Sequence, residues 1–391
     1  MRLFNAARLI LLTGLFTQLA AAAPFVPADD NQVVESGLPN ADPRVRQMRT
    51  LAGVLKQRPD DLAIAMRLAS RQLAMGVAEA DPRFVGYARG TLARWWQDEP
   101  ASPQLRILRA RILQAQHDFA RAAADLRAAL RDAPLSPQAL LVLASIDEVT
   151  GDFTEAKDAC ARFAAMHPGL AASACAASIG SLTGAAETGQ AALADALTKN
   201  PTADTSLRVW ALTILGEIAQ RRDDPVATEY LREALALDRR DVYALTIFAD
   251  YLLDHNRAAE VLQLLRGFER IDALYLRLTL AAQATGDPHF LEYREDMASR
   301  LEAARRQGDT LHLRDASRFA LEIERNSARA LDFAQQNWAV HKTPYDARAL
   351  LAAAIACRDL AAARPVVDWV AMTGIEDRTL ERLVGRLISA G

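Results

Sequence analysis

The sequence has few of the residues that mark a catalytic or metal-binding chain. It contains three cysteines and six histidines in 391 residues, and no two histidines stand four positions apart. No cysteine pair has the spacing of metal ligands. Glycine-rich phosphate-binding loops and the nucleophile-elbow pattern are also absent. We therefore predict no catalytic residues, no metal and no cofactor.

Aromatic residues and excess positive charge are scarce as well. Aromatics make up 6% of the chain, whereas alanine makes up about a fifth of it. This composition favours closely packed helices over a β-sandwich or barrel, because strands are enriched in branched and aromatic side chains. Lys+Arg 46 against Asp+Glu 49 gives a formal net charge of −3. The chain therefore has no basic field for nucleic acid, and we predict no nucleic-acid partner.

The N-terminus has the pattern of an export signal. Two arginines precede a short apolar run, Leu9–Leu19, and a small-residue cleavage site follows it. We predict a signal peptide over residues 1–22, cleaved after Ala22, and a flexible leader over residues 23–43. The alternative is an uncleaved anchor, but the run is shorter than the ~20 apolar residues of a membrane span. We expect a periplasmic or secreted protein with no stable membrane span after cleavage.

A regular repeat runs through the rest of the chain. Its period is marked by Pro100, Pro134, Pro168 and Pro201, which recur at almost equal spacing. Shifted by one period, Leu105–Pro134 superposes on Ala139–Pro168 in the role of almost every residue. Each unit predicts a first helix, a tight turn and a second helix. One such pair cannot bury its apolar face alone, so we expect the pairs to stack.

This pattern resembles the tetratricopeptide repeat (TPR) family, whose units are about 34 residues long. The residues that carry the resemblance are Leu143-Ala144, Gly151-Asp152-Phe153, Ala156 and Pro168 in one unit, and Leu215-Gly216, Ala227, Tyr230 and Ala234-Leu235 in another. The match is best over 101–239, and weaker copies precede and follow it. The resemblance implies an all-α fold over 44–391: a TPR-like α-solenoid, a right-handed superhelix of helix–turn–helix repeats with about nine helix pairs.

The resemblance also implies where a partner binds. In TPR-like solenoids the first helices line a concave groove, and their solvent-facing positions determine specificity. The local match places Arg111, Gln114, Glu148, Ser178, Glu217, Arg221, Tyr243, Asp250 and Asp254 at these positions, with Trp210 as a further aromatic candidate. Some members of the family clamp a C-terminal carboxylate with lysine and asparagine. Those positions here hold Ile107/Leu108, Leu141/Val142 and Thr213/Ile214, which disfavours that mode of binding.

Two of the three cysteines are placed to meet. Cys160 lies in the second helix of one predicted unit and Cys175 in the first helix of the next, at similar distances from Pro168. Two antiparallel helices with a rise of about 1.5 Å per residue place them almost level. A bridge also requires Cα atoms within roughly 4.4–6.8 Å. The spacing leaves two possibilities open, a disulfide or two separate core residues.

The export signal, the repeat and the missing catalytic motifs predict a non-enzymatic adaptor of the bacterial cell envelope. It would bind a peptide or protein, itself an envelope or secreted component, in the concave groove. One alternative is a glycan- or peptidoglycan-acting hydrolase that uses Glu217 and Asp250, which we expect roughly 10 Å apart on neighbouring first helices. The other is a self-assembling structural repeat protein that forms homo-oligomers.

Overall fold

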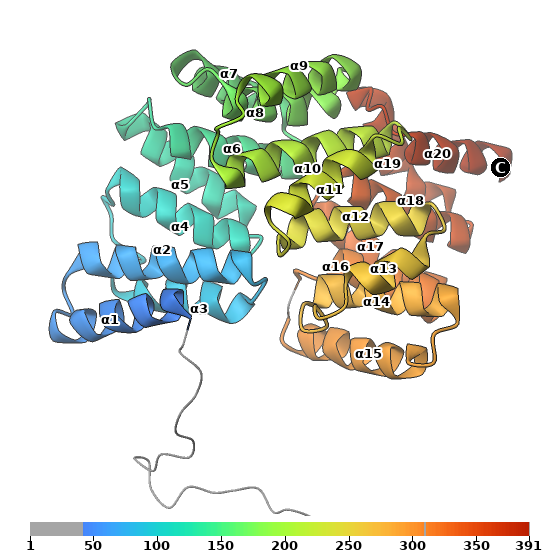
Figure 1. The fold of residues 1–391 in the computed structure, drawn as a ribbon, viewed down its shortest axis with the longest axis horizontal. Helices are drawn as coiled ribbons and strands as arrows, with labels where there is room; N and C mark the ends of the chain where they lie inside the picture. Colours follow the sequence, from blue (N-terminus) through green and yellow to red (C-terminus); the bar gives the residue numbers. More distant parts are fainter. Residues whose placement is uncertain (1–41, 309, 391) are drawn as a thin grey trace, which may run out of the picture. The chain divides into compact units, whose positions relative to one another are not determined.

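A computed structural model of the chain describes residues 42–308 and 310–390. Every regular element in this part of the chain is helical (Figure 1). The repeats lie in one compact unit, residues 47–391. The predicted signal peptide and nearly all of the predicted leader lie outside the described residues.

Nine helix pairs follow one another along the described chain. The first helices are α2 (Leu62–Ala78), α4 (Pro103–Ala115), α6 (Pro137–Thr150), α8 (Leu170–Ser181), α10 (Thr205–Arg221), α12 (Val242–Asp254), α14 (Asp272–Thr285), α16 (Leu313–Arg318) and α18 (Pro344–Cys357). The second helices are α3 (Pro82–Thr91), α5 (Phe119–Asp132), α7 (Phe153–Met166), α9 (Ala186–Lys199), α11 (Ala227–Leu237), α13 (Ala258–Leu264), α15 (Phe290–Arg306), α17 (Ser327–Val340) and α19 (Leu360–Thr373). The helix α1 (Pro43–Gln57) precedes these pairs and α20 (Arg378–Ala390) follows them; a 3-10 turn, η1 (Ala93–Trp95), and a π-helical turn, η2 (Phe319–Ile323), complete the set. The predicted all-α, TPR-like α-solenoid is confirmed.

The repeat chemistry explains where the helices begin and end. Ser102 and Ser136, one repeat apart, each accept a hydrogen bond from the backbone N–H three residues on, and proline follows each at the first helical position. Gly151 ends α6 with φ +86°, a left-handed conformation that glycine adopts without strain. His117 and Asp223 take the same role in the turns that lack glycine, with φ of +58° and +62°.

Small residues let the two helices of a pair approach closely. Ala110, Ala144 and Ala249, at equivalent places in their first helices, are almost completely buried. At the corresponding position of α10, a Cβ on Gly216 would lie 2.6 Å from Leu231 Cγ on α11. This contact excludes any side chain at Gly216 unless Leu231 moves.

The disulfide geometry follows from this packing. Cys160 on α7 and Cys175 on α8 are bonded, and their Cα atoms lie 5.7 Å apart. The bridge therefore joins the second helix of one repeat to the first helix of the next. Cys357 on α18 is free and partly exposed.

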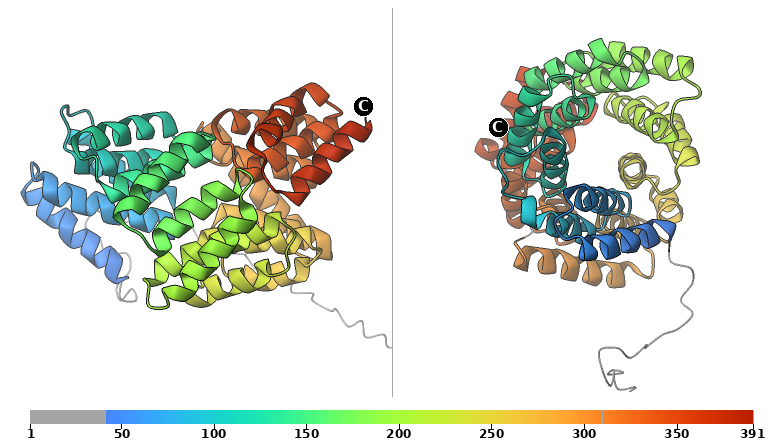
Figure 2. Two further views of the ribbon diagram at one scale, coloured as in Figure 1. Left: turned by 90° about the horizontal axis from the view of Figure 1, so that it is seen from above. Right: turned by 90° about the vertical axis from the view of Figure 1, so that its left-hand side faces the viewer.

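The last helices pack against the turns of much earlier repeats. The Lys342 backbone N–H donates to the Val149 carbonyl at 2.7 Å, at the end of α6. His341 Nε2 lies 3.0 Å from His117 Nδ1, and the Ala186 N–H donates to the Glu376 carboxylate at 3.0 Å. One apolar core accordingly joins residues of α2–α8 to residues of α16–α20. Figure 2 shows these red C-terminal helices alongside the teal and green ones.

Candidate functional site

Polar pairs join the first helices of successive repeats. We call this series the polar ladder. Its rungs are Gln114–Ser145 (α4 to α6, 3.1 Å), Glu148–Ser178 (α6 to α8, 2.8 Å), Ser181–Arg221 (α8 to α10, 2.6 Å), Glu217–Tyr243 (α10 to α12, 2.7 Å), Asp250–Arg277 (α12 to α14, 2.8 Å) and Arg277–Asp315 (α14 to α16, 2.9 Å). Each intermediate helix therefore contacts both of its neighbours through polar side chains.

Helical spacing explains how one helix serves two rungs. Ser145 and Glu148 are three residues apart on α6, so they project from the same face of the helix. Glu217 and Arg221 are four residues apart on α10 and do the same. One residue of each pair faces the preceding repeat and the other faces the following repeat.

The ladder becomes fully ionic at α12–α16. The Arg277 side chain is 1% exposed and pairs with two buried carboxylates, Asp250 and Asp315. Asp250 also accepts from Arg318 Nη1 at 2.6 Å. Burial alone would raise the pKa of Asp250, but the charges of Arg277 and Arg318 outweigh it and hold that pKa well below its usual value. This cluster stays ionised across the physiological pH range.

The two glutamates of the ladder, Glu148 and Glu217, have the opposite electrostatics. Burial raises the pKa of Glu148 to about 7, partly offset by the hydrogen bond from Ser178. Burial also raises the pKa of Glu217, which accepts a hydrogen bond from Tyr243. Neither carboxyl group has a guanidinium within ion-pair distance in the described part of the chain, so the effect of burial on each pKa outweighs the effect of the more distant Arg221 charge.

These contacts correct several predicted groove positions. Asp250 and Arg221 were predicted to face solvent, but they are only 7% and 5% exposed, because neighbouring first helices approach closely enough to cover them. Gln114, Glu148 and Glu217 bond to the next first helix, and Asp254 accepts from Arg348 on α18 at 3.3 Å. Tyr243 and Trp210 remain exposed. With Asp250 held between arginines, the predicted Glu217–Asp250 pair provides no free second carboxylate for glycoside hydrolysis.

Arg111 differs from the other predicted positions because it lines an open groove. The groove, of about 590 Å³, is formed by α2, α4 and the loop before α6. We call it the Arg111 groove; its apolar lining includes Met66, Ile107, Leu108, Pro134 and Leu135. Among the described residues the Arg111 guanidinium has no hydrogen-bond or ion-pair partner. Burial lowers its pKa. A partly desolvated, unpaired cation among apolar side chains favours an anionic ligand.

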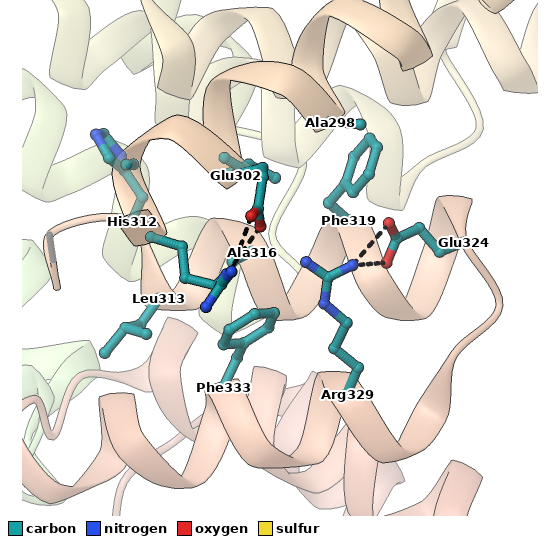
Figure 3. Close-up of a pocket in the computed structure, with 12 residues that line it drawn as sticks. Ala298, Glu302, His312, Leu313, Ala316, Phe319, Glu324, Arg329 and Phe333 are labelled. Atoms are coloured by element: carbon teal, nitrogen blue, oxygen red, sulfur yellow. Dashed lines mark hydrogen bonds and ion pairs between the residues drawn. The ribbon is translucent and has the colours of Figure 1, made fainter. Parts of the chain in front are cut away.

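A second cavity lies between α15, α16, η2 and α17 (Figure 3). It has a volume of about 230 Å³ and a largely apolar lining that includes Leu301, Phe319 and Phe333. Ion pairs Glu302–Arg305 and Glu324–Arg329 lie at its edge. We call it the Phe333 cavity. Sequence reasoning did not predict it, because its walls come from the units that match the repeat least well.

Two further properties concern only the described residues, 42–308 and 310–390. No helix there is long and apolar enough to cross a membrane. No group of three or more histidine, cysteine or acidic side chains in that range is arranged to hold a metal ion.

Comparisons with known proteins find structural similarities of low score and no family match. No protein-family model matches the sequence, and no curated protein matches it. The crystal structure of yeast Tom70 is 13% identical over 89% of this chain and 84% of that chain, with a TM-score of 0.41. The TPR domain of P58(IPK) is 14% identical over 81% of this chain and 94% of that one, with a TM-score of 0.21. At such scores the TPR-like assignment depends on the repeat and the helix pairs themselves.

Sequence reasoning missed the residues that fill the inner face from the C-terminal side. Tyr345 on α18 donates to Gln220 on α10 at 3.1 Å, and Arg348 bonds to both Asp254 and Asp377. The sequence does contain one indication of the ladder. Arg277 is the single charged residue in the segment LYLRLTL. A charge at such a position predicts a buried partner, because an isolated buried charge is too costly.

Arg277 should dominate the stability of the ladder. Arg277→Met leaves Asp315 without its charged partner and Asp250 with one partner fewer. We expect the free energy of unfolding in urea to fall by about 3–5 kcal/mol. Adding Asp315→Asn should recover part of this loss. The exposed Lys199–Asp195 pair provides the control, because Lys199→Met should change stability by less than about 1 kcal/mol. A comparably small change for Arg277→Met would contradict the role given to it.

Glu148 should give the protein a defined pH dependence. Its pKa rises from 4.5 to about 7 on folding. Between these values the folded chain holds a proton that the unfolded chain has lost, so stability falls as the pH rises across this window. Glu148→Gln should be more stable than wild type by about 1–3 kcal/mol at about pH 8, and similar near pH 4. Urea unfolding over this range measures it. The exposed Glu229→Gln on α11 is the control, and parallel pH profiles for all three proteins would refute the prediction.

Proposed function

We propose that the protein is an exported, non-enzymatic interaction scaffold of the bacterial cell envelope, and that it binds an extended segment of another envelope or secreted protein in the Arg111 groove. The observation behind the binding site is the unpaired Arg111 inside an open, apolar-lined groove. Peptide-binding grooves combine apolar pockets with a few polar groups that fix orientation. The Arg111 groove has both.

The lining defines the chemistry of the bound segment. Leu135 is 73% exposed, so covering it removes apolar surface from water. Gln104 and Gln138 are equivalent residues of successive repeats at the groove. Their amides provide donors and acceptors for the backbone of an extended peptide. Arg111 provides a bidentate donor for one carboxylate. The preferred segment is therefore apolar, with an acidic residue or a free carboxyl terminus next to its apolar side chains.

The export half of the proposal is supported by the sequence of residues 1–22. A positively charged start, a short apolar run and a small-residue site are the three parts of a cleaved signal. The disulfide between Cys160 and Cys175 is compatible with this location, because disulfides persist in oxidising compartments.

Charge reversal at Arg111 should change which peptides bind. A random peptide library displayed on phage, selected on the wild-type protein, should yield sequences with Asp or Glu beside apolar residues. Arg111→Glu should reduce the affinity of a selected peptide by at least about tenfold, because each charge-assisted contact of this kind contributes about 1.5–3 kcal/mol.

The matched control is Arg239→Glu, which reverses an exposed arginine after α11. It should leave the affinity unchanged, and circular dichroism melts should show that both variants are folded. Selected peptides that lack acidic residues, or that bind Arg111→Glu as tightly as wild type, would rule out the Arg111 groove as the recognition site.

Export should leave a defined mature N-terminus. When the full chain is expressed in a Gram-negative host, the protein recovered from the periplasm should begin at Ala23, as measured by intact mass and N-terminal sequencing. A chain that retains Met1 and stays in the cytoplasm or the membrane fraction would contradict export by cleavage.

A further inference from the structure

The Phe333 cavity is enclosed mainly by apolar side chains from helices that belong to two successive repeats. Phe319 and Phe333 are 2% and 9% exposed; they belong to two different apolar cores, and Leu301 packs against both. Three alanines, Ala298, Ala304 and Ala316, line the cavity where larger side chains would fill it. Apolar cavities of this kind bind apolar groups, because the walls lose no hydrogen bonds when water leaves.

A π-helical turn shapes one wall of the cavity. The Glu324 N–H donates to the Phe319 carbonyl at 3.1 Å, five residues back instead of four. Phe319 begins this turn, η2, and contributes to the lining. Such turns occur mostly as local insertions in α-helices and are frequent at functional sites.

Two glutamates and two arginines line the edge of the cavity. Glu302 accepts from Arg305 at 2.8 Å and from Arg306 at 2.9 Å, and these two guanidiniums lower its pKa to about 2. Glu324 pairs with Arg329. Arg306 lies outside the lining, so the acidic and basic side chains that line the cavity balance in charge.

Arg329 has donors left for a ligand. Its Nη1 donates to both oxygens of Glu324 at 3.0 Å, while its Nε and Nη2 make no hydrogen bond within the described chain. Its guanidinium lies 5.3 Å from the centre of the Phe333 ring. Figure 3 shows the Arg329 side chain reaching toward the space between Phe319 and Phe333. An anionic group beside these rings would thus meet two free N–H groups of one guanidinium.

We propose that the Phe333 cavity binds a small apolar carboxylate, with an acyl or aryl chain against Phe319 and Phe333 and a carboxylate on Arg329. The cavity volume of about 230 Å³ suits a short chain or a single ring. An uncharged ligand would gain only the apolar contact. A basic ligand would place a second positive charge beside the Arg329 guanidinium.

Three ligands with one tail test this directly. Octanoate, octan-1-ol and octylammonium are titrated into the mature protein at low salt, and binding is measured by isothermal calorimetry. Octanoate should bind one to one and about two- to fivefold more tightly than octan-1-ol, as one partly exposed charge pair allows. Octylammonium should bind most weakly. Octanoate that binds no more tightly than octylammonium would overturn the proposal.

Two variants separate the carboxylate contact from the apolar contact. Arg329→Met should lower octanoate affinity to that of octan-1-ol and leave octan-1-ol unchanged, and Ala304→Leu, which fills the cavity, should abolish both. Arg294→Met, on the same helix α15 but away from the cavity, should bind like wild type. If Arg111→Glu removes octanoate binding while Arg329→Met does not, the ligand occupies the Arg111 groove and the proposal is wrong.

Discussion

Close approach of neighbouring first helices requires the polar residues on their shared face to pair with one another. Small residues such as Ala110, Ala144 and Gly216 allow tight packing within each helix pair, and neighbouring first helices in turn cover Arg221 and Asp250. A polar group buried there without a partner costs more than a hydrogen bond returns. The ladder meets this requirement because each repeat supplies the partner for its neighbour. Apolar contacts alone would tolerate sliding of one helix against the next, whereas paired polar groups tolerate much less.

The sequence could predict the repeat because the repeat is local. A regular period, alanines at fixed places and capping serines all act within one helix pair. The same reasoning placed Glu148, Glu217 and Asp250 at solvent-facing positions of first helices, whereas each of them bonds to a neighbouring first helix. It interpreted these side chains as partner-binding residues, because the sequence does not give the distance between neighbouring first helices. That distance depends on how whole repeats stack, so the sequence of one repeat does not determine whether Asp250 faces solvent or Arg277.

Contacts between distant repeats could not be predicted from the sequence for a related reason. Lys342 meets Val149 and His341 meets His117, although several whole repeats separate the two partners of each pair along the chain. No periodic pattern encodes such a meeting. Gly151 shows how closely these distant segments approach. The turn needs a positive φ, and a Cβ on this residue would also lie 3.0 Å from Lys342 Cβ. This turn glycine thus has a second role that becomes visible only once the C-terminal helices are in place.

The Arg111 groove follows from the way the ladder begins. Gln114 on α4 bonds forward to Ser145, but Arg111, one turn earlier on the same helix, faces Met66 and Ser70 of α2 across the groove. The helix α2 contains no acidic residue, so it offers Arg111 no charged partner of the kind that the ladder provides elsewhere. Folding has already removed part of the water from the guanidinium. A carboxylate that binds there meets a donor that is already partly desolvated, and such preorganisation increases the affinity that a short peptide can reach.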